Sequence, residues 1–231
     1  MMSGLGHARL AGVDRMPGGW LVVMDSGDKE TTINRAWTLA EVAAINGLEF
    51  VVIDIPIGLP ELGARECDLE AGKVLGSPRS SSVFPAPIRQ MLRARSYEEA
   101  SEIRYQVEGK RISRQSFAIF GTIREADALM TPVLQDRIVE GHPEVSFAAM
   151  AGAGIAAPKR TTEGRQIRIE LLSRDFPDFR LRIAELSPGL QVDAIDAYAL
   201  LWSARRLAGG TAERLGDTSR DDHGLRMEMV Y

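Results

Sequence analysis

The sequence is poor in cysteine, since Cys67 is the only one among 231 residues. A single thiol excludes an internal disulfide and a zinc ribbon built on paired CxxC motifs. No apolar run is long enough to span a bilayer, and the opening stretch MMSGLGHARLAGVD lacks the apolar core of a signal peptide. These absences predict a cytoplasmic protein that has no membrane segment.

An excess of positive charge is also missing. Lysine and arginine total 28 against 32 aspartates and glutamates, which gives a formal net charge of −4 and a pI near 5.5. No global field therefore draws the protein to nucleic acid or to an anionic membrane. With 45 % hydrophobic and 26 % charged residues, the chain has the composition of an ordinary globular protein. Its length suits one large α/β domain or a domain with an insertion.

Several common catalytic motifs are absent from the sequence. The stretch GAGIAAPK departs from the GxxxxGK[ST] spacing of a phosphate-binding loop. Neither the GxSxG motif of a nucleophile elbow nor the HExxH motif of a zinc protease occurs. Functional candidates must therefore come from acidic and basic residues and from the elements that carry them.

The N-terminal quarter of the sequence predicts strands followed by a short helix. Three strand-like stretches are separated by turns at Pro17–Gly19 and Gly27-Asp28: LAGVD (10–14), WLVVMDS (20–26) and TTINRAW (31–37). Thr38 with Glu41 three residues later predicts the N-terminus of a helix over TLAEVAAIN. The apolar run FVVIDIP follows this helix and is therefore predicted to lie parallel to the first strand.

Residues 61–135 differ from their surroundings because they show helical periodicity and few strand signals. They predict a helical insertion within a single domain that spans 1–231. Three stretches are predicted to be helical: ARECDLEAGKVLG (64–76), PIRQMLRARSYEEASEIRYQVEG (87–109) and ISRQSFAIFGTIREADALM (112–130). After the insertion, residues 136–147 are predicted to return to a strand that surfaces at Glu140.

The C-terminal third predicts two helices and a further strand. A Gly/Ala-rich loop over 151–158 precedes the basic helix TTEGRQIRIELLSRDF, and the longer helix QVDAIDAYALLWSARRLAGG ends at Gly209-Gly210. The final stretch GLRMEMVY alternates in polarity and is predicted to add an edge strand.

Acidic residues end three of the predicted strands: Asp14, Asp54 and Glu140. In open α/β sheets, ligands bind at the edge formed by the carboxyl ends of the strands. The last long helix adds Asp193 and Asp196, which begin a stripe that is otherwise apolar. That stripe continues through Leu200, Ala204 and Leu207. The face that packs on the sheet therefore carries carboxylates at its N-terminal end.

Clustered carboxylates repel one another unless cations lie between them. Hard divalent ions prefer oxygen ligands, so the cluster predicts Mg²⁺ or Mn²⁺. Structural explanations also exist: a turn for Asp14, a backbone cap for Asp54, the helix dipole for Asp193 and an arginine partner for Glu140. Asp196 is harder to explain in this way, because it lies deeper in the helix on the apolar face.

Basic residues give weaker signals for substrate binding. Arg79, His142 and Lys159 are candidates to orient a phosphate group. His142 fits a hydrogen-bonded loop residue equally well, and the basic residues from Lys159 to Arg168 fit a solvated helix face. Between Arg65 and Arg114, ten lysines and arginines face seven acids, which indicates at most a weak basic rim on the insertion.

Several blocks of the sequence together resemble a known family. They are AGVDRMPGGW, VVIDIPIGLP, SPRSSSVFPAP, VEGHPEVSFAAM, PKRTTEGRQIRIELL and VDAIDAYALLWSA, and the ending GLRMEMVY is similar too. In this order they resemble the predicted RNase H-like nucleases, a domain-of-unknown-function family of bacteria and archaea. The resemblance implies an RNase H-like fold, in which helices flank a five-stranded mixed sheet of order 3-2-1-4-5.

The resemblance also implies roles for the acids. Asp14 matches the acid of the first strand and Asp54 that of the fourth. Asp193 and Asp196 match the acidic pair on the last helix of Holliday-junction resolvases in this superfamily, and Glu140 lies in the family's own Glu-x-His-Pro-Glu block. We therefore expect a metal-dependent nuclease in which Asp14, Asp54 and Asp196 hold two divalent ions, with Asp193 or Glu140 as a further ligand.

Two other functions remain open at this stage. A hydrolase or phosphotransferase for small phosphate compounds could use the same fold, because net acidity and a bulky insertion could close the cleft to a duplex. A binding protein could also have kept the fold and lost turnover. Sugar-kinase and actin-like ATPases need a duplicated domain, for which 231 residues are too few. The sequence leaves the oligomeric state open, a homodimer included.

Overall fold

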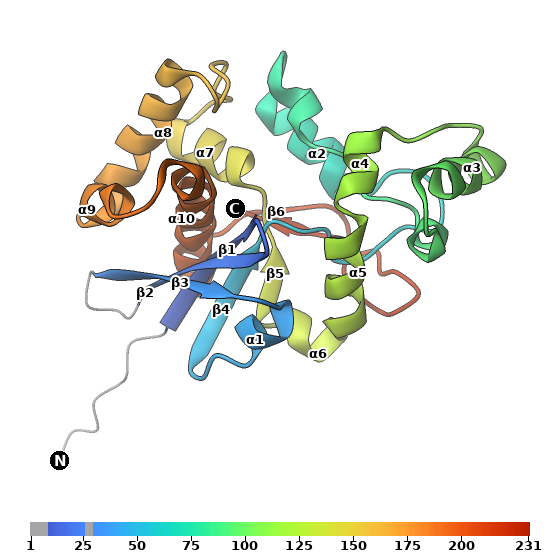
Figure 1. Cartoon of the computed structure of the whole chain (residues 1–231), viewed down its shortest axis with the longest axis horizontal. Coiled ribbons are helices and arrows are strands. Elements are labelled where there is room, and N and C mark those ends of the chain that lie inside the picture. Colours follow the sequence, from blue (N-terminus) through green and yellow to red (C-terminus); the bar gives the residue numbers. More distant parts are fainter. Residues whose placement is uncertain (1–8, 26–29) are drawn as a thin grey trace.

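A five-stranded mixed sheet forms the centre of the molecule (Figure 1). The structure is a computed structural model that describes residues 9–25 and 30–231, so the predicted Gly27-Asp28 turn and Ser26 lie outside the described residues. The strands are β1 (Arg9–Met16), β2 (Gly19–Asp25), β3 (Thr31–Ala36), β4 (Leu48–Ile53) and β5 (Ile138–Glu140). Their order is β3-β2-β1-β4-β5, as predicted. The first three strands pair antiparallel, whereas β4 runs parallel to both β1 and β5.

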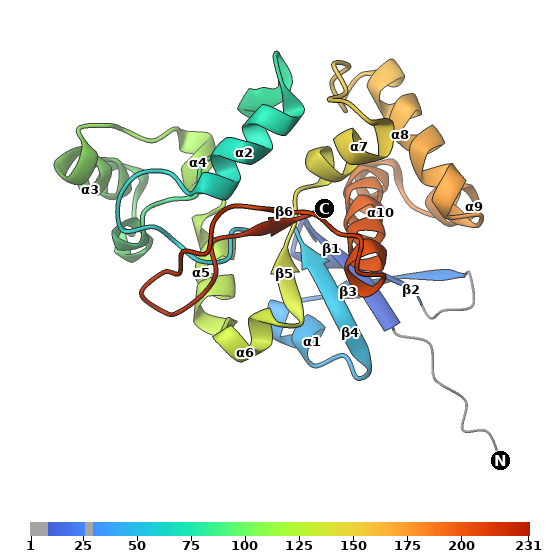
Figure 2. The same cartoon turned by 180° about the vertical axis from the view of Figure 1, so that it is seen from behind.

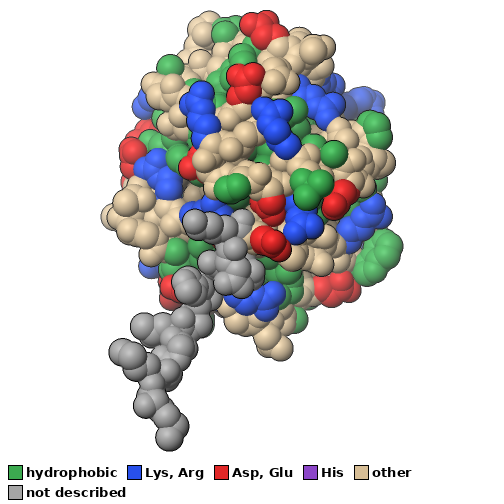
Figure 3. All heavy atoms as spheres, turned by 90° about the vertical axis from the view of Figure 1, so that its left-hand side faces the viewer, with side chains coloured by type: hydrophobic (Ala, Val, Ile, Leu, Met, Phe, Trp, Pro, Cys, Tyr) green, Lys and Arg blue, Asp and Glu red, His purple; other side chains and the backbone are tan. Residues whose placement is uncertain are grey.

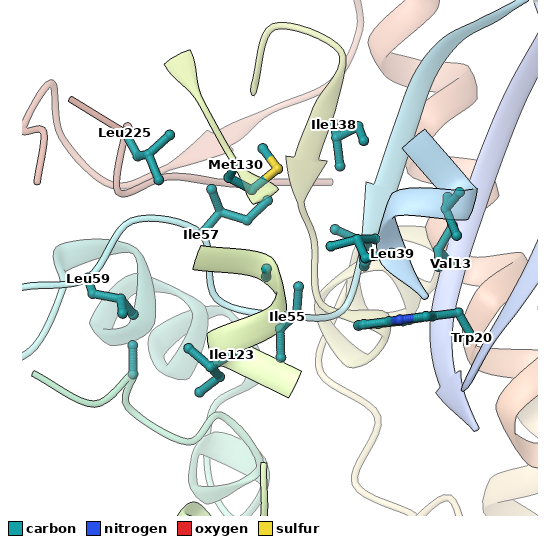
Figure 4. Packing of buried hydrophobic residues seen from close by; sticks show 14 of the residues in the cluster. Val13, Trp20, Leu39, Ile55, Ile57, Leu59, Ile123, Met130, Ile138 and Leu225 are labelled. Atoms are coloured by element: carbon teal, nitrogen blue, oxygen red, sulfur yellow. The ribbon is translucent and has the colours of Figure 1, made fainter. Parts of the chain in front are cut away.

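Alternation along the strands divides the core between the two faces of the sheet. Val13 pairs with Ile53, and both belong to a cluster that also contains Trp20 and residues of α1 (Leu39–Ala43) and α5 (Phe120–Leu129) (Figure 4). The neighbouring positions point the other way and pack under α8 (Thr162–Asp175), α9 (Phe179–Ala184) and α10 (Pro188–Ala208). The sheet is therefore covered by helices on both faces, as expected of an α/β fold.

The long helix α10 packs directly on β1, β2 and β4 (Figure 2). Gly12 allows this close approach, since a Cβ atom there would lie 2.0 Å from the carbonyl oxygen of Ala197 and 2.2 Å from the backbone nitrogen of Leu201. The predicted stripe faces the sheet, with Asp196, Leu200 and Ala204 buried. Close packing at Gly12 thus brings the start of the stripe to the carboxyl ends of β1 and β4.

Between β4 and β5 the chain forms the helices α2 (Glu66–Leu75), α3 (Tyr97–Glu108), α4 (Arg114–Ala118), α5 and α6 (Pro132–Gln135). Two predictions need correction here. The helix predicted over 87–109 begins only at Tyr97, because the Ser96 hydroxyl caps it by accepting a hydrogen bond from the Glu99 backbone at 3.1 Å. Before it lies a short 3₁₀ turn, Arg89–Arg93. The helix predicted over 112–130 is divided into α4 and α5 at Ile119.

The strand predicted within 136–147 ends at Glu140, as predicted. The rest of that stretch belongs to a helix that was not predicted, α7 (Pro143–Ala151), with His142 as N-cap and Pro143 in its first turn. Helix α9 was likewise not predicted. The predicted C-terminal edge strand is replaced by a two-stranded ribbon of β6 (Arg214–Leu215) and β7 (Met229–Val230), which touches the central sheet through one bridge from Val230 to Gly141.

The short helix α1 confirms its predicted start. The Thr38 hydroxyl accepts a hydrogen bond from the Glu41 backbone at 3.2 Å, and the Glu41 carboxylate accepts one from the Trp37 backbone at 2.8 Å. Helix α10 ends before Gly209 and Gly210, as predicted, and Gly210 has a φ of 68°. None of the helices in the described residues combines the length and apolar character needed to cross a bilayer.

Candidate active site

Asp14 and Asp54 stand beside each other at the edge formed by the carboxyl ends of β1 and β4. Val13 lies opposite Ile53, and the Asp54 backbone nitrogen donates to the Val13 carbonyl at 3.1 Å. Because each acid is one residue beyond this pair, alternation turns both toward the face that α10 covers. Asp14 is buried, with 7 % of its surface exposed, and Asp54 is half-buried.

Asp196 joins these two acids from the first half of α10. It is 3 % exposed, and its Oδ2 atom accepts a hydrogen bond from the Lys159 ammonium at 2.5 Å. Its Oδ1 atom is buried and has no hydrogen-bond partner among the residues that the structure describes. An unpaired buried carboxylate oxygen is costly, so this atom marks a place where a ligand would be favoured.

The electrostatics of the group show that it carries too much negative charge. Burial, followed by repulsion from Asp196 and Asp54, raises the pKa of Asp14 well above its usual value. Burial also raises the pKa of Asp196, although Lys159 acts in the opposite direction. For Lys159 itself, burial lowers the pKa, but Asp196, Asp54 and Asp14 together more than offset that effect and the net pKa is raised. One ammonium therefore serves three carboxylates, and we call Asp14, Asp54, Asp196 and Lys159 the acid cluster.

Asp193 lies one turn before Asp196 and is half-buried. Burial and the nearby charge of Asp196 raise its pKa to about 6, and Lys159 opposes this shift. The structure thus places Asp193 at the margin of the acid cluster. Its role as an additional metal ligand stays a prediction.

Glu140 lines the same pocket as Asp14 and Asp54, but its side chain leaves the sheet on the other face. It pairs with Ile53 on β4, so its side chain points to the face opposite that of Asp54. Its carboxylate accepts two hydrogen bonds from the Arg65 guanidinium, both at 2.7 Å, and one from the Ile57 backbone at 2.7 Å. These contacts match the structural alternative, an arginine partner, and its catalytic role stays a prediction.

Arg65 connects Glu140 to a second buried acid, Asp68. It donates to both Asp68 oxygens, at 2.6 and 3.1 Å, and to the Ile57 and Gly58 carbonyls. Asp68 also accepts from the Ala86 backbone at 3.0 Å. We call Arg65, Asp68 and Glu140 the arginine clamp. It holds the segment that follows Asp54 and thereby helps to position that residue.

A pocket of about 520 Å³ opens over three members of the acid cluster, Asp14, Asp54 and Lys159, and over the arginine clamp. Asp14, Asp54 and Lys159 line it from the sheet and the loop after α7, and Arg160 lies beside them. The opposite wall comes from the insertion. It includes Arg79, Ser81, Ser82, Phe84, Gln115 and Ile119. A bound molecule would therefore contact the carboxylates on one side and the insertion on the other.

The predicted phosphate-binding residues Arg79 and His142 also line this pocket. The Nδ1 atom of His142 accepts a hydrogen bond from the Glu144 backbone at 3.2 Å and so caps α7. A terminal nitrogen of Arg79 donates to Glu144 at 3.4 Å, while its buried Nε atom finds no partner within the described part of the chain. Arg79 thus keeps an unused donor, whereas one of the two ring nitrogens of His142 is already hydrogen-bonded.

The sequence did not reveal the contribution of Arg168. A solvated helix face was one prediction for this region, and it is wrong for Arg168, which is 1 % exposed. Its guanidinium binds Glu144 at 3.0 and 2.5 Å and donates to the Ala157 and Gly164 carbonyls. Because these carbonyls lie on both sides of Lys159, Arg168 fixes the loop that brings Lys159 to Asp196.

The donor set of the acid cluster fits a hard divalent ion. Carboxylate oxygens are the preferred ligands of Mg²⁺ and Mn²⁺, and the unpaired Oδ1 atom of Asp196 offers one. Across residues 9–25 and 30–231, however, no three His, Cys, Asp or Glu side chains are arranged ready to hold one ion. The Lys159 ammonium instead neutralises part of the cluster, so an ion would have to compete with it for Asp196.

The sequence matches the model of a known protein family. A family model described as "Protein of unknown function (DUF429)" matches residues 12–220. The chain belongs to this family. The DUF429 match spans the acid cluster, the arginine clamp and both walls of the pocket. No curated protein and no solved structure matched the sequence.

Proposed function

We propose that this DUF429 protein is an RNase H-like hydrolase that cleaves phosphodiester bonds in nucleic acid with the help of Mg²⁺ or Mn²⁺. One observation carries the proposal: Asp14, Asp54 and Asp196 converge from two adjacent strand ends and one helix. They are served by a single ammonium, and the Asp196 Oδ1 atom has no partner in the described residues. Such a group is unfavourable without a cation and favourable with one.

The arrangement of the sheet supports this proposal. Its order, β3-β2-β1-β4-β5, with acids on the first and fourth strands and on the last long helix, matches what the family resemblance implies for RNase H-like enzymes. A shared fold does not by itself establish an activity, so the proposal depends on the acid cluster.

Each residue of the site would have a distinct task. Asp14, Asp54 and Asp196 would hold the metal, which supplies an activated water and stabilises the leaving oxygen when it is bound. Lys159 limits repulsion among the carboxylates and, with Arg79, offers positive charge to a phosphate in the pocket. Arg65 and Glu140 hold the backbone beyond Asp54, and Arg168 holds the loop of Lys159.

The dimensions of the pocket favour a second candidate, a hydrolase for small phosphate esters. A volume of about 520 Å³ lies within the range of roughly 300–1,000 Å³ that is typical of small-molecule sites. The insertion also forms a wall beside the acids, which restricts access from that side. The chemistry would be the same, and only the size of the substrate would differ.

Hydrolysis assays with Asp54→Asn test the proposal. The wild-type protein should hydrolyse a chromogenic phosphodiester or a single-stranded oligonucleotide in Mn²⁺ and lose this activity in EDTA. Asp54→Asn should abolish the activity without altering the circular dichroism spectrum. Asp222→Asn, an exposed acid outside the pocket, is the matched control and should keep full activity. Activity that survives in Asp54→Asn, or a wild-type protein inactive on both substrates, would contradict the proposal.

A further inference from the structure

Apolar side chains are exposed inside the pocket, close to the acid cluster. Phe84 and Ile119 remain 43 % and 38 % exposed, and both line the same pocket as Asp14 and Lys159. They come from different elements of the insertion, Phe84 from the segment after the 3₁₀ turn Arg79–Ser82 and Ile119 from the junction of α4 and α5. Exposed apolar side chains in a pocket can bind a flat apolar group of a ligand.

We propose that the pocket binds one nucleotide unit, with its base on Phe84 and Ile119 and its phosphate between Lys159 and Arg79. This inference rests on the proposed hydrolase function and narrows its substrate to the end of a single strand or, under the second candidate function, to a free nucleotide. The phosphate then lies beside the acid cluster, and the insertion selects for the base.

The phosphate end of the pocket has cations with unused capacity. Glu144 binds Arg168 more closely than Arg79, at 2.5 Å compared with 3.4 Å to the same oxygen. The Nε atom of Arg79 has no partner in the residues described, and the Lys159 side chain is 36 % exposed. Both cations can therefore contact an anion. Arg79 can do so without breaking a strong hydrogen bond.

The opposite end of the pocket suits a base. An aromatic ring stacks on any base, because every base has a flat π-face. Gln115, also on the insertion wall, carries an amide that can bond to the edge of a base. Phe84 and Ile119 also border a second pocket of about 180 Å³, so they form an apolar partition that is open on both sides.

The charges of the insertion argue against an extended duplex. Several arginines of the insertion are paired with acids instead of being left for phosphates. These pairs are Arg89 with Asp127, Arg104 with Glu108, Arg111 with Glu102, and Arg114 with Glu98. On the side of the molecule that carries α9, away from the insertion, basic and acidic side chains are interspersed as well (Figure 3). A duplex needs a run of phosphate contacts, whereas one nucleotide needs a single anion site.

Calorimetric titration with adenosine 5′-monophosphate and with ribose 5-phosphate tests the subsite, because the two compounds differ by the base. With wild-type protein the nucleotide should bind roughly tenfold more tightly. Phe84→Ala should remove most of this preference, and Phe84→Trp should retain it. Arg79→Met should weaken both ligands to the same extent. Trp37→Ala removes an aromatic residue that is 72 % exposed outside the pocket, and it should change neither affinity.

Equal affinities of the wild-type protein for the two ligands would overturn the subsite, as would equal losses in Phe84→Ala. Ile119→Ser changes a separate element of the same wall and should also reduce the preference for the nucleotide. A 5′-phosphorylated single strand that binds as well as the nucleotide identifies strand ends as the source, and a nucleotide that binds alone identifies free nucleotides. The subsite can fail while Mn²⁺-dependent hydrolysis still requires Asp54, so the two proposals are tested separately.

Discussion

Two groups of acids border the same pocket, and their strand residues point to opposite faces of the sheet. The acid cluster faces α10 and combines Asp14, Asp54 and Asp196 with Lys159. The arginine clamp faces the insertion and combines Glu140 and Asp68 with Arg65. Both groups have more carboxylates than cations, so net charge alone does not distinguish them.

Hydrogen bonding does distinguish them. In the arginine clamp, one guanidinium donates to all four carboxylate oxygens, and the Ile57 and Ala86 backbones add two further donors. In the acid cluster, Asp196 receives one hydrogen bond on Oδ2, and Oδ1 receives none from the described residues. Acids whose oxygens are all paired hold a fold together, whereas acids left partly unpaired are available to a ligand.

The largest expected effect is the loss of stability in Arg65→Met. The substitution leaves two buried carboxylates without their counter-charge, which should lower the free energy of unfolding by about 3–5 kcal/mol. Urea denaturation followed by circular dichroism measures the change. Arg93→Met, at an exposed arginine of the same insertion, should have almost no effect. Similar stabilities of the two variants would show that the clamp is not structural.

Metal binding should separate the acids of α10. Asp196 is buried against the strand ends and has an unpaired oxygen, whereas Asp193 is half-buried at the margin. We expect Asp196→Ala to weaken Mn²⁺ binding by tenfold or more and Asp193→Ala by much less, in calorimetric titrations. Helix content should stay unchanged in both. Unaltered Mn²⁺ binding in both variants would leave these acids without a metal-binding role.

A smaller effect of opposite sign to that of Arg65→Met is expected from Asp14→Asn. The amide is nearly the same size as the acid and removes one repulsive charge, so the metal-free protein should gain roughly 0.5–2 kcal/mol of stability at neutral pH. Thermal unfolding in EDTA gives this value. A loss of stability comparable to that in Arg65→Met would mean that Asp14, like Glu140 and Asp68, holds the fold together.

The smallest expected effect concerns pH and Asp193. Its folded pKa of about 6 exceeds the ordinary value of 3.8, so the folded protein holds this proton more tightly than the unfolded chain does. The stability that Asp193 contributes is present below pH 3.8 and is lost as the pH rises through 6. Asp193→Asn should therefore reduce the fall in melting temperature over this interval. Identical pH profiles for the variant and the wild type would contradict the shift.

Local signals predicted the first four strands and the place of β4 beside β1, whereas the full order of the sheet came from the family resemblance. Buried apolar runs mark the strands, and a helix between two strands implies a parallel crossover. The missed helix α7 also has local signals, since His142 caps it and Pro143 begins it. They were obscured because β5 has only three residues, Ile138–Glu140, and its apolar run leads directly into the helix.

The sequence could not separate Glu140 from Asp14 and Asp54. All three acids follow apolar runs, and the face that each one takes depends on the register of the strands. Glu140 is level with Ile53, one position before Asp54, and this single step turns it to the other side of the sheet. Register is set by tertiary packing, which no single stretch of the sequence shows.

The loop residues were equally inaccessible to prediction. Lys159 reaches Asp196 because Arg168 binds the carbonyls around it, and Arg168 is buried because Glu144 pairs with it. Each of these contacts joins residues that are distant in the sequence and have no shared pattern. The basic helix face was therefore easily taken for a solvated one.

Diffraction from a crystal soaked in Mn²⁺ tests the central claim most directly. We expect anomalous density for one or two ions beside Asp14, Asp54 and Asp196, with the Lys159 ammonium displaced from Asp196, and none at the arginine clamp. An acid cluster without anomalous density, in which Lys159 still binds Asp196, would contradict the account. Density at Glu140 and Asp68 would reverse the roles assigned to the two groups of acids.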